Sequence, residues 1–326
     1  MSKDLILGID GGQTSTKAVL ATPDGTIISA GSGPPCDHIS GPNGREINRR
    51  AIHGAARHAL DNAGETPERI AAVGMGLTSA AREHHAGDIF RDIVRELCTP
   101  KVIWVDADFV SNLYGASAGA PGVVIIAGGG SIGYGTDGRG REAITGGLGF
   151  LMGDDGSAWY LGLRAIVAAT HANDGRGQPT ALLPFVCDHY GLASVREIIR
   201  VIYAADFTRD QVSSIAPDVV RIASHDDVAR GIVTDAGQKL AGIVLATIRR
   251  VYEPGETVDV YPTGGVFAAG PRITEPFTTA IADAWPTAII REPRFPPVIG
   301  ALLQAFHAQG ITITPAVLDQ IDRTLP

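Results

Sequence analysis

The sequence is poor in cysteine and in basic charge, and each shortage excludes a class of protein. Its 326 residues include three cysteines, Cys36, Cys98 and Cys187. Their spacing fits neither a zinc site nor a disulfide framework, so we expect a reducing compartment. Asp and Glu outnumber Lys and Arg by 35 to 27, a net charge of -8. This balance argues against nucleic acid or an anionic membrane as a partner.

Long hydrophobic runs are also missing. Lys3 and Asp4 precede an apolar run that is far too short for a signal peptide or a membrane span. The sequence therefore predicts a cytoplasmic protein. Apolar residues make up 44% and charged residues 19%, a globular composition, and the length predicts about two domains. A small-molecule substrate fits this chain better than nucleic acid or an anionic membrane surface.

The familiar phosphate-loop motifs are absent too. There is no G-x-x-x-x-G-K-[ST], and the glycines near the start lead into the apolar residues 18–20, which predict a strand where a nucleotide-binding helix would be expected. The segment Gly8–Lys17 instead predicts a hairpin between two apolar strands. Its tip would offer backbone N–H groups and a hydroxyl to a phosphate chain. An ordinary glycine turn is the alternative.

The residues at this tip have separate predicted roles. Asp10 ends the first strand, where its carboxylate could hold Mg²⁺, which bridges carboxylate to phosphate oxygens. The predicted phosphate contacts are Gly11, Gly12, Gln13 and Thr14.

The pattern of the first half is repeated in the second. The first half forms one α/β unit. Its predicted elements are strands at 5–9, 18–20 and 26–28, a glycine-rich loop at 31–44, a helix at 46–63 and strands at 70–77 and 101–105. A second glycine hairpin at 128–131 opens the next unit, which contains a long helix at 228–252 and a strand at 258–261. We therefore predict an α/β protein of two duplicated lobes, residues 1–118 and 119–326, with the active site in the cleft between them. The closing helix, at 298–307, could pack back on the first lobe.

Five motifs occur in an order that resembles one family. They are D-G-G-x-T, V-D-A, A-G-G-G-S, G-G-x-G-x-x-x-G-D-D-G-S and T-G-G-V-F, and they extend over essentially the whole chain. The sequence is similar to N-acetylglucosamine kinases and to the BadF/BadG/BcrA/BcrD ATPases, within the superfamily of sugar kinases, heat-shock chaperones and actin. This resemblance implies a duplicated ribonuclease H-like, actin-like ATPase fold that uses ATP and Mg²⁺.

The resemblance also implies roles for individual residues. Asp106 matches the catalytic base of the kinases, which accepts the proton of the substrate hydroxyl. The implied ATP contacts, beyond the first loop, are Gly128, Gly129, Gly130 and Ser131 of the second loop and Gly264 and Gly265 on the adenosine side. The implied sugar contacts are Asp37, His38, Thr78, Gly146, Gly147 and Asp154.

Several residues depart from the family pattern. Gly129 replaces a threonine, which removes a hydroxyl from the second phosphate loop, and Leu148 replaces a tryptophan. Asp37 stands where the family has an asparagine. An ionised aspartate can only accept hydrogen bonds, and it favours a cationic group nearby. The departures therefore bear on the choice of sugar, and leave the phosphate chemistry in place.

Other acidic and histidine residues have structural explanations. Asp108 is the nearby rival of Asp106 for the role of catalytic base, but we favour its interpretation as a helix N-cap. Asp154 and Asp155 could cap the helix that follows Ser157, although for Asp154 we favour the sugar contact. His84 and His85 are adjacent, a poor spacing for a metal site on a helix, and are interpreted as surface residues.

The predicted function is an ATP-dependent amino-sugar kinase that phosphorylates the 6-hydroxyl of N-acetylglucosamine or a close relative. Glucosamine is the alternative substrate. A second hypothesis is an ATPase that activates a CoA-ester reductase or dehydratase, but the three cysteines lack the closely spaced pair that its iron–sulfur cluster would need. A catalytically inactive sugar or nucleotide sensor is the third. We expect a homodimer.

Overall fold

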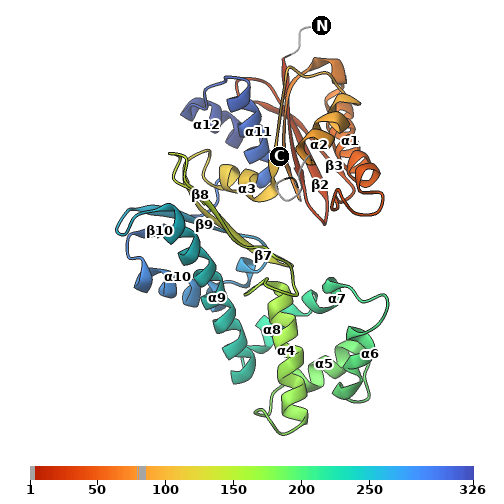
Figure 1. The fold of residues 1–326 in the computed structure, drawn as a ribbon, viewed down its shortest axis with the longest axis vertical. Coiled ribbons are helices and arrows are strands. Elements are labelled where there is room, and N and C mark those ends of the chain that lie inside the picture. The colour runs from red at the N-terminus through yellow and green to blue at the C-terminus, as the bar shows by residue number, and fades with distance from the viewer. Residues whose placement is uncertain (1–3, 79, 81–85) are drawn as a thin grey trace. The chain divides into compact units, whose positions relative to one another are not determined.

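A computed structural model describes residues 4–78, 80 and 86–326 (Figure 1). The chain forms two compact units. The first extends to Pro121 and also contains Glu292–Pro326, and the second is Gly122–Arg291. The predicted boundary at residue 118 thus falls three residues later, and the end of the chain belongs to the first unit. His84 and His85 lie outside the described residues.

The first unit is built on a five-stranded mixed sheet. Its strands are β1 (Leu5–Gly11), β2 (Thr16–Ala21), β3 (Ile27–Gly33), β4 (Ile70–Leu77) and β5 (Val102–Ala107), in the order β3-β2-β1-β4-β5. The strands β1, β2 and β3 are antiparallel, whereas β4 and β5 run parallel to β1. The carboxyl ends of β1, β4 and β5 therefore meet at one edge of the sheet, the edge that carries Asp10 and Asp106.

Helices cover both faces of this sheet. They are α1 (Gly44–Ala63), α2 (Ala86–Arg95), α3 (Asp108–Ala116), α11 (Pro297–Ala308) and α12 (Pro315–Thr324), together with the short η1 (Pro67–Arg69). Alternate residues of β1 divide between two cores: Leu7 and Ile9 pack with α1 and α2, and Ile6 packs with α11 and α12. Figure 1 shows these two pairs of helices on opposite sides of the strands. Period-two alternation in a strand produces this two-sided burial.

Glycines in the first sheet allow helices to approach its strands closely. We expected a loop from residue 31, but β3 continues to Gly33. A Cβ on Gly31 would lie 2.4 Å from the carbonyl oxygen of Ala55, and one on Gly33 would lie 2.5 Å from that of Ala51. The glycines that suggested a loop are therefore the contact surface for α1. This packing explains why the expectation was wrong.

The second unit repeats the sheet of the first. Its strands are β6 (Gly122–Ala127), β7 (Ser131–Thr136), β8 (Glu142–Gly146), β9 (Val258–Thr263) and β10 (Ala288–Ile290), in the order β10-β9-β6-β7-β8. Again the first three strands are antiparallel and the last two are parallel to the first. Both sheets thus share one topology, and the duplication predicted from the two glycine hairpins is confirmed.

The helices of the second unit form one core with its sheet. They are α4 (Ala158–Asn173), α5 (Leu182–Tyr190), α6 (Ile199–Ile202), α7 (Arg209–Ser213), α8 (Ala216–Ile222), α9 (Asp227–Val251) and α10 (Pro271–Ala284), with the short η2 (Val195–Ile198) and η3 (Phe267–Ala269). The predicted long helix is α9, whose buried stripe packs against β6, β7 and β8. Asp226 caps it by accepting a 2.8 Å hydrogen bond from the Ala229 N–H.

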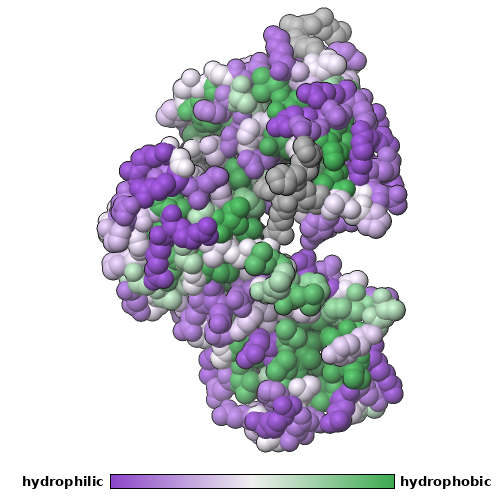
Figure 2. Space-filling model, in the orientation of Figure 1, coloured by the Kyte–Doolittle hydropathy of each residue, from purple (hydrophilic) through white to green (hydrophobic). Residues whose placement is uncertain are grey.

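The surface of the helical part of the second unit has apolar areas, seen as green patches in Figure 2. Exposed apolar side chains include Ile199 and Tyr203 near α6, and Leu148, Leu151 and Met152 between β8 and α4. Within the described ranges, no helix has the length and hydropathy needed to cross a membrane.

Candidate functional site

The first glycine hairpin joins β1 to β2 and is fixed by its neighbours. The Gly12 N–H donates to the Ser15 carbonyl over 3.1 Å, and the Gly12 carbonyl accepts from the Cys36 N–H over 3.0 Å. A Cβ on Gly11 would lie 2.6 Å from the Cys36 sulfur, so this position requires glycine. Gln13 and Thr14 are exposed at the tip. Of the four predicted phosphate contacts, Gln13 and Thr14 are therefore presented to solvent, whereas Gly11 is buried beneath them.

Asp10 and Asp106 lie in one row of the first sheet. Asp10 is in register with Gly76 of β4, and Gly76 is in register with Asp106 of β5. Two strand spacings separate the two aspartates, about 10 Å between their backbones. A Cβ on Gly76 would lie 1.6 Å from the Ser111 hydroxyl oxygen. Glycine at the middle strand thus lets α3 pack tightly behind the row that carries both carboxylates.

The Asp10 carboxylate sits in an environment that suits a cation. The pKa of Asp10 is raised to about 7, first by burial and then by the neighbouring Asp108, while Lys17 on the facing strand opposes both effects. A divalent cation would offset both the burial and the like charge. Oxygen ligands of this kind are the ones Mg²⁺ prefers, so Asp10 and Asp108 fit the predicted ion. In the described part of the chain, no group of three His, Cys, Asp or Glu side chains is arranged to hold a metal, and most ligands of such an ion would be water and phosphate.

Asp108 is not the helix cap that we predicted. The N-cap position of α3 is Ala107, and Asp108 is the first residue of the helix. Its carboxylate Oδ2 accepts a 3.0 Å hydrogen bond from the Thr78 hydroxyl. The side chain is turned toward the end of β4 and the neighbourhood of Asp10. Asp106 lies half-buried two residues earlier, near the end of β5, and its Oδ1 accepts from the Ala107 N–H over 2.7 Å.

The loop after β3 carries Asp37 and His38, both exposed. Asn48, fully buried in α1, holds this loop: its amide nitrogen donates over 2.8 Å to the Asp37 carbonyl and over 2.8 Å to the Gly44 carbonyl. The Asp37 carboxylate accepts from the His38 N–H over 2.7 Å. Both predicted sugar contacts therefore belong to a loop that is tied to α1 by the Asn48 side chain and to the first hairpin by the Cys36 N–H.

The second glycine hairpin, Gly128–Ser131, is packed against the N-terminus of α4. The Ala158 and Trp159 N–H groups donate to the carbonyls of Gly128 and Gly129 over 2.9 and 3.4 Å. Among the described residues, the N–H groups of Gly129 and Gly130 have no hydrogen-bond acceptor. Free N–H groups beside a helix N-terminus form an anion site. The hairpin is therefore suited to phosphate.

The element from residue 146 to 157 wraps around this second hairpin. The Gly147 N–H donates to the Ser131 carbonyl over 3.0 Å, and Asp154 Oδ1 accepts from the Ser131 N–H over 3.1 Å. Asp154 is 4% exposed and has a φ of 61°, a left-handed conformation that is uncommon for aspartate. The cap of α4 is Ser157, whose hydroxyl accepts from the Tyr160 N–H. Capping by Asp154 or Asp155 is thus wrong, and Asp154 supports the hairpin.

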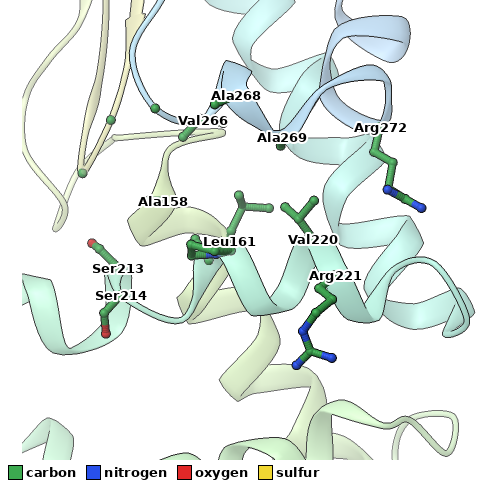
Figure 3. A pocket seen from close by; sticks show the side chains of 15 residues that line it. Ala158, Leu161, Ser213, Ser214, Val220, Arg221, Val266, Ala268, Ala269 and Arg272 are labelled. Carbon is green, nitrogen blue, oxygen red and sulfur yellow. The ribbon is translucent and has the colours of Figure 1, made fainter.

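A pocket of about 650 Å³ lies beside the second hairpin. Figure 3 shows Leu161 and Val220 next to each other at its centre, with Ala268 and Ala269 above them and the guanidinium groups of Arg221 and Arg272 directed away from that centre. Gly128, Gly129 and Gly265 also line it. Its wall is mostly apolar and includes small side chains, as expected for a flat aromatic ligand.

The third glycine turn follows β9 and helps to form this pocket. Gly264 has a φ of 97°, and a Cβ there would lie 2.3 Å from the Ala127 carbonyl oxygen. The Val266 N–H donates to the same carbonyl over 3.0 Å. The end of β6 and the end of β9 are thereby joined next to the second hairpin. The structure brings Gly128–Ser131, Gly146, Gly147, Asp154, Gly264 and Gly265 together in one unit.

Sequence reasoning missed two side chains near these predicted residues. Asn48 is described above, and the other is Arg209 at the start of α7, whose Nη2 would lie 3.0 Å from a Cβ on Gly129. Asn48 has a weak signal, since a polar residue interrupts the apolar stripe of α1. Arg209 has none, because it is distant in sequence from every glycine motif.

The shared strand order, with a glycine hairpin at the start of each sheet, defines a duplicated ribonuclease H-like α/β fold of the actin and sugar-kinase class. Solved structures agree: a provisionally assigned N-acetylglucosamine kinase from Chromobacterium violaceum has a TM-score of 0.75 and 25% identity, and 93% of this chain aligns with 99% of it. A glucokinase of the ROK family from Streptomyces griseus, solved with glucose and AMPPNP, has a TM-score of 0.59 at 17% identity, over 94% of this chain and 99% of that one. The second likeness is one of fold alone.

Residues 7–305 match the BadF/BadG/BcrA/BcrD ATPase family. The chain belongs to this family. It is 30% identical over 264 residues to an N-acetylmuramic acid/N-acetylglucosamine kinase of Clostridium acetobutylicum, covering 80% of this chain and 85% of the relative. It is 24% identical over 323 residues to an N-acetyl-D-glucosamine kinase of Dictyostelium discoideum, covering 95% and 100%. The family resemblance found in the motifs is confirmed.

Proposed function

We propose that the protein is an ATP-dependent kinase for an amino sugar, with N-acetylglucosamine or a close relative as substrate and the 6-hydroxyl as acceptor. The observation that carries this proposal is the row of Asp10 and Asp106 at one edge of a sheet, beside an exposed glycine hairpin. Phosphoryl transfer needs cradled phosphates, a cation and a carboxylate that accepts the hydroxyl proton. The kinase names of the relatives, among them a glucosamine kinase of Vibrio cholerae 28% identical over 184 residues, support the same chemistry.

The proposed roles follow from the local geometry. Asp106 accepts the proton of the sugar hydroxyl, and Asp10 holds Mg²⁺, which when bound supplies charge neutralisation for the transferring phosphate. In the second hairpin the N–H groups of Gly129 and Gly130 bind phosphate oxygens. Gly11, Gly12, Gln13 and Thr14 are the proposed phosphate contacts of the first hairpin. The pocket lined by Leu161 and Val220 takes the adenosine, since its apolar walls suit a purine ring.

The proposed sugar contacts are Asp37, His38 and Thr78, together with Gly146 and Gly147. Asp154, the other predicted sugar contact, is buried and accepts from the Ser131 N–H, so we propose that it supports the second hairpin. Asp37 is exposed on the loop that Asn48 fixes. Its carboxylate can therefore accept hydrogen bonds from hydroxyls or pair with an ammonium group. Free glucosamine is therefore the second candidate substrate. The activator hypothesis is less well supported, because Cys36 and Cys98 are buried and would not reach an exposed cluster.

The test is a panel of sugars assayed with ATP and Mg²⁺. The compounds to be compared are N-acetylglucosamine, N-acetylmuramic acid, glucosamine, glucose and a CoA ester, the last without any reductase present. We expect ADP release only with the amino sugars, and nuclear magnetic resonance of the product should show phosphate on the carbon-6 oxygen. ADP release that is independent of every sugar would contradict the kinase. Phosphate on another hydroxyl would correct the position alone.

A further inference from the structure

Arg209 lies over the second glycine hairpin, in a place where a side chain on Gly129 would otherwise be. A Cβ built on Gly129 would lie 3.0, 3.3 and 3.5 Å from Nη2, Cζ and Nε of Arg209. All three distances are to guanidinium atoms, so the flat face of the group covers this glycine. The side chain of Arg209 is 28% exposed, and it comes from α7, 80 residues further along the chain.

The backbone does not explain why residue 129 is glycine. Gly129 is absent from the positions of positive φ, so its conformation is one that any residue can adopt. The structural reason for glycine at position 129 is instead the closeness of the Arg209 guanidinium. The departure from the family's threonine at this position therefore coincides with an arginine that occupies the adjacent space.

A buried carboxylate holds Arg209 at this place. Asp154 Oδ2 lies 3.9 Å from Arg209 Nη1. Asp154 is 4% exposed, and Oδ2 has no hydrogen-bond partner within the described residues. The same carboxylate covers the next glycine, since a Cβ on Gly130 would lie 2.7 Å from Asp154 Oδ1. Arg209 and Asp154 thus flank consecutive glycines of one hairpin.

This arrangement has an electrostatic consequence for an anion. A buried carboxylate next to a phosphate would repel it, and the repulsion is strong where water is excluded. The guanidinium offsets the charge of Asp154 and has five N–H donors for oxygen acceptors. It also lies beside the N–H groups of Gly129 and Gly130, which have no acceptor of their own among the described residues. The Arg209 guanidinium and the N–H groups of Gly129 and Gly130 together offer the donors that a ligand with several negatively charged oxygens would need.

We propose that Arg209 binds the terminal phosphates of the nucleotide, held for this task by Asp154 and admitted by the absence of a side chain at Gly129. The inference rests on the proposed function, because it places the nucleotide phosphates at the second hairpin. Arg209 stabilises the charge on the phosphates beyond the α-phosphate, whereas the pocket of Leu161 and Val220 binds the adenosine. Asp154 acts through Arg209 and Ser131 as a positioning residue.

Binding measurements separate this role from a structural one. Calorimetry in Mg²⁺ would compare adenosine, AMP, ADP and a non-hydrolysable ATP analogue on the wild-type protein and on Arg209→Gln. We expect the variant to bind the ATP analogue at least tenfold more weakly while its affinity for adenosine and AMP changes less than twofold. Arg209→Lys should recover part of the loss, because it keeps the charge without the fork. Arg230→Gln, an exposed arginine on α9 that pairs with Asp227, is the matched control and should leave every affinity unchanged.

A double-mutant cycle tests the link to Gly129. In Gly129→Ala the methyl group would push the guanidinium aside by a few tenths of an ångström, so affinity for the ATP analogue should fall several-fold. In the Arg209→Gln background the same change should have little effect, since the group it displaces is gone. Additive losses in the cycle would overturn the proposed cause.

The outcomes also distinguish this inference from the proposed function. A wild-type protein that binds no adenine nucleotide would overturn both. Nucleotide binding and sugar-dependent turnover that survive Arg209→Gln with all four affinities unchanged would overturn the role of Arg209 alone. An equal loss for adenosine and for the ATP analogue would assign Arg209 to the shape of the pocket, and would overturn the phosphate contact.

Discussion

The Thr78 hydroxyl donates a 3.0 Å hydrogen bond to the Asp108 carboxylate. This bond joins the end of β4 to the first residue of α3 and turns Asp108 toward Asp10. The negative charge of Asp108 raises the pKa of Asp10. Two carboxylates, Asp106 and Asp108, therefore stand near the same edge of the sheet with different partners. Their separate roles can be tested by the same substitution at each position.

Asp106→Asn should abolish phosphoryl transfer and leave nucleotide binding nearly intact. The amide keeps the shape of the side chain but cannot accept the proton of the sugar hydroxyl. Loss of a general base lowers the rate by about 10²- to 10⁴-fold. The measurement is kcat on the best sugar of the panel, together with the Kd for ADP. Normal turnover by this variant would remove Asp106 from the mechanism.

The matched control is Asp108→Asn. Its amide can still accept from the Thr78 hydroxyl, so the bond to β4 can persist, but the negative charge near Asp10 is gone. We expect a higher requirement for Mg²⁺ and a kcat at saturating Mg²⁺ within about tenfold of the wild-type value. A kcat loss as large as that of Asp106→Asn would make Asp108 the better candidate for the base.

Asp10→Asn should stabilise the protein above neutral pH in the absence of Mg²⁺. The folded-state pKa of Asp10 is about 7, against 3.8 for the unfolded chain. Well below pH 3.8 the carboxyl is protonated in both states, and its ionisation no longer contributes to the difference between the variant and the wild type. As the pH rises to 7, the wild-type protein loses stability, because the folded state resists ionisation. The variant should be more stable at pH 8 by on the order of 1–2 kcal/mol, below the linkage limit of about 4 kcal/mol.

The measurement for Asp10 is the free energy of unfolding from denaturant titrations at pH 4, 6 and 8. Asp24→Asn is the control of opposite sign, because the Thr22 hydroxyl and the Thr26 N–H lower the pKa of Asp24. Its substitution should destabilise at pH 8 and have less effect as the pH falls below 4. Added Mg²⁺ should narrow the difference between Asp10→Asn and the wild type at pH 8. A pH-independent effect of Asp10→Asn would refute the electrostatic account.

The sequence predicted the local features of the fold well. The hairpins, the long helix α9 and the glycine that ends α1 each have a signal within a few residues, and Gly64 indeed has a left-handed φ of 64°. The sequence did not predict contacts between residues that are far apart in the chain. Gly31 and Gly33 looked like loop residues because nothing nearby in the chain reveals that α1 packs onto them.

The same distinction holds for the candidate site. Gly264 can be found because the backbone itself requires glycine there, at a φ of 97°, and Gly11 because it belongs to the glycine motif of the first hairpin. Asp108 was assigned to a cap because its hydrogen bond to Thr78 spans 30 residues. Arg209 lies beside Gly129 only through the packing of α7 against the hairpin. Side chains brought in by tertiary packing leave no mark on the spacing of a motif.

Val220→Trp should block the proposed adenosine pocket. Val220 lies at the centre of the pocket in Figure 3, and an indole there would fill the space that a purine needs. We expect the KM for ATP to rise at least tenfold, with little change in the KM for the sugar. Ile199→Trp is the control, because Ile199 is 58% exposed and does not line this pocket. An unchanged KM for ATP in Val220→Trp would move the adenosine elsewhere.

Asn48→Ala should loosen the loop that carries Asp37 and His38. The substitution removes two 2.8 Å hydrogen bonds of a fully buried side chain, a loss of about 1–3 kcal/mol of stability. Since the change does not touch the chemistry of the loop, the KM values for all sugars should rise together. The KM for ATP should stay the same. Unequal effects among the sugars would contradict a purely positional role.

Asp37→Asn should change the preference among sugars where Asn48→Ala does not. The carboxylate can only accept hydrogen bonds, whereas an amide both accepts and donates. If Asp37 lies by the 2-substituent of the sugar, its charge favours the ammonium of glucosamine over the neutral acetamide. The asparagine variant should then shift kcat/KM from glucosamine to N-acetylglucosamine by about tenfold, which is about 1.4 kcal/mol. Assays of both sugars across the pH range in which glucosamine loses its proton would show the shift fading as the ammonium deprotonates. An equal loss on both sugars at every pH would place Asp37 on the ring hydroxyls, and no effect on either would remove the loop from the sugar site.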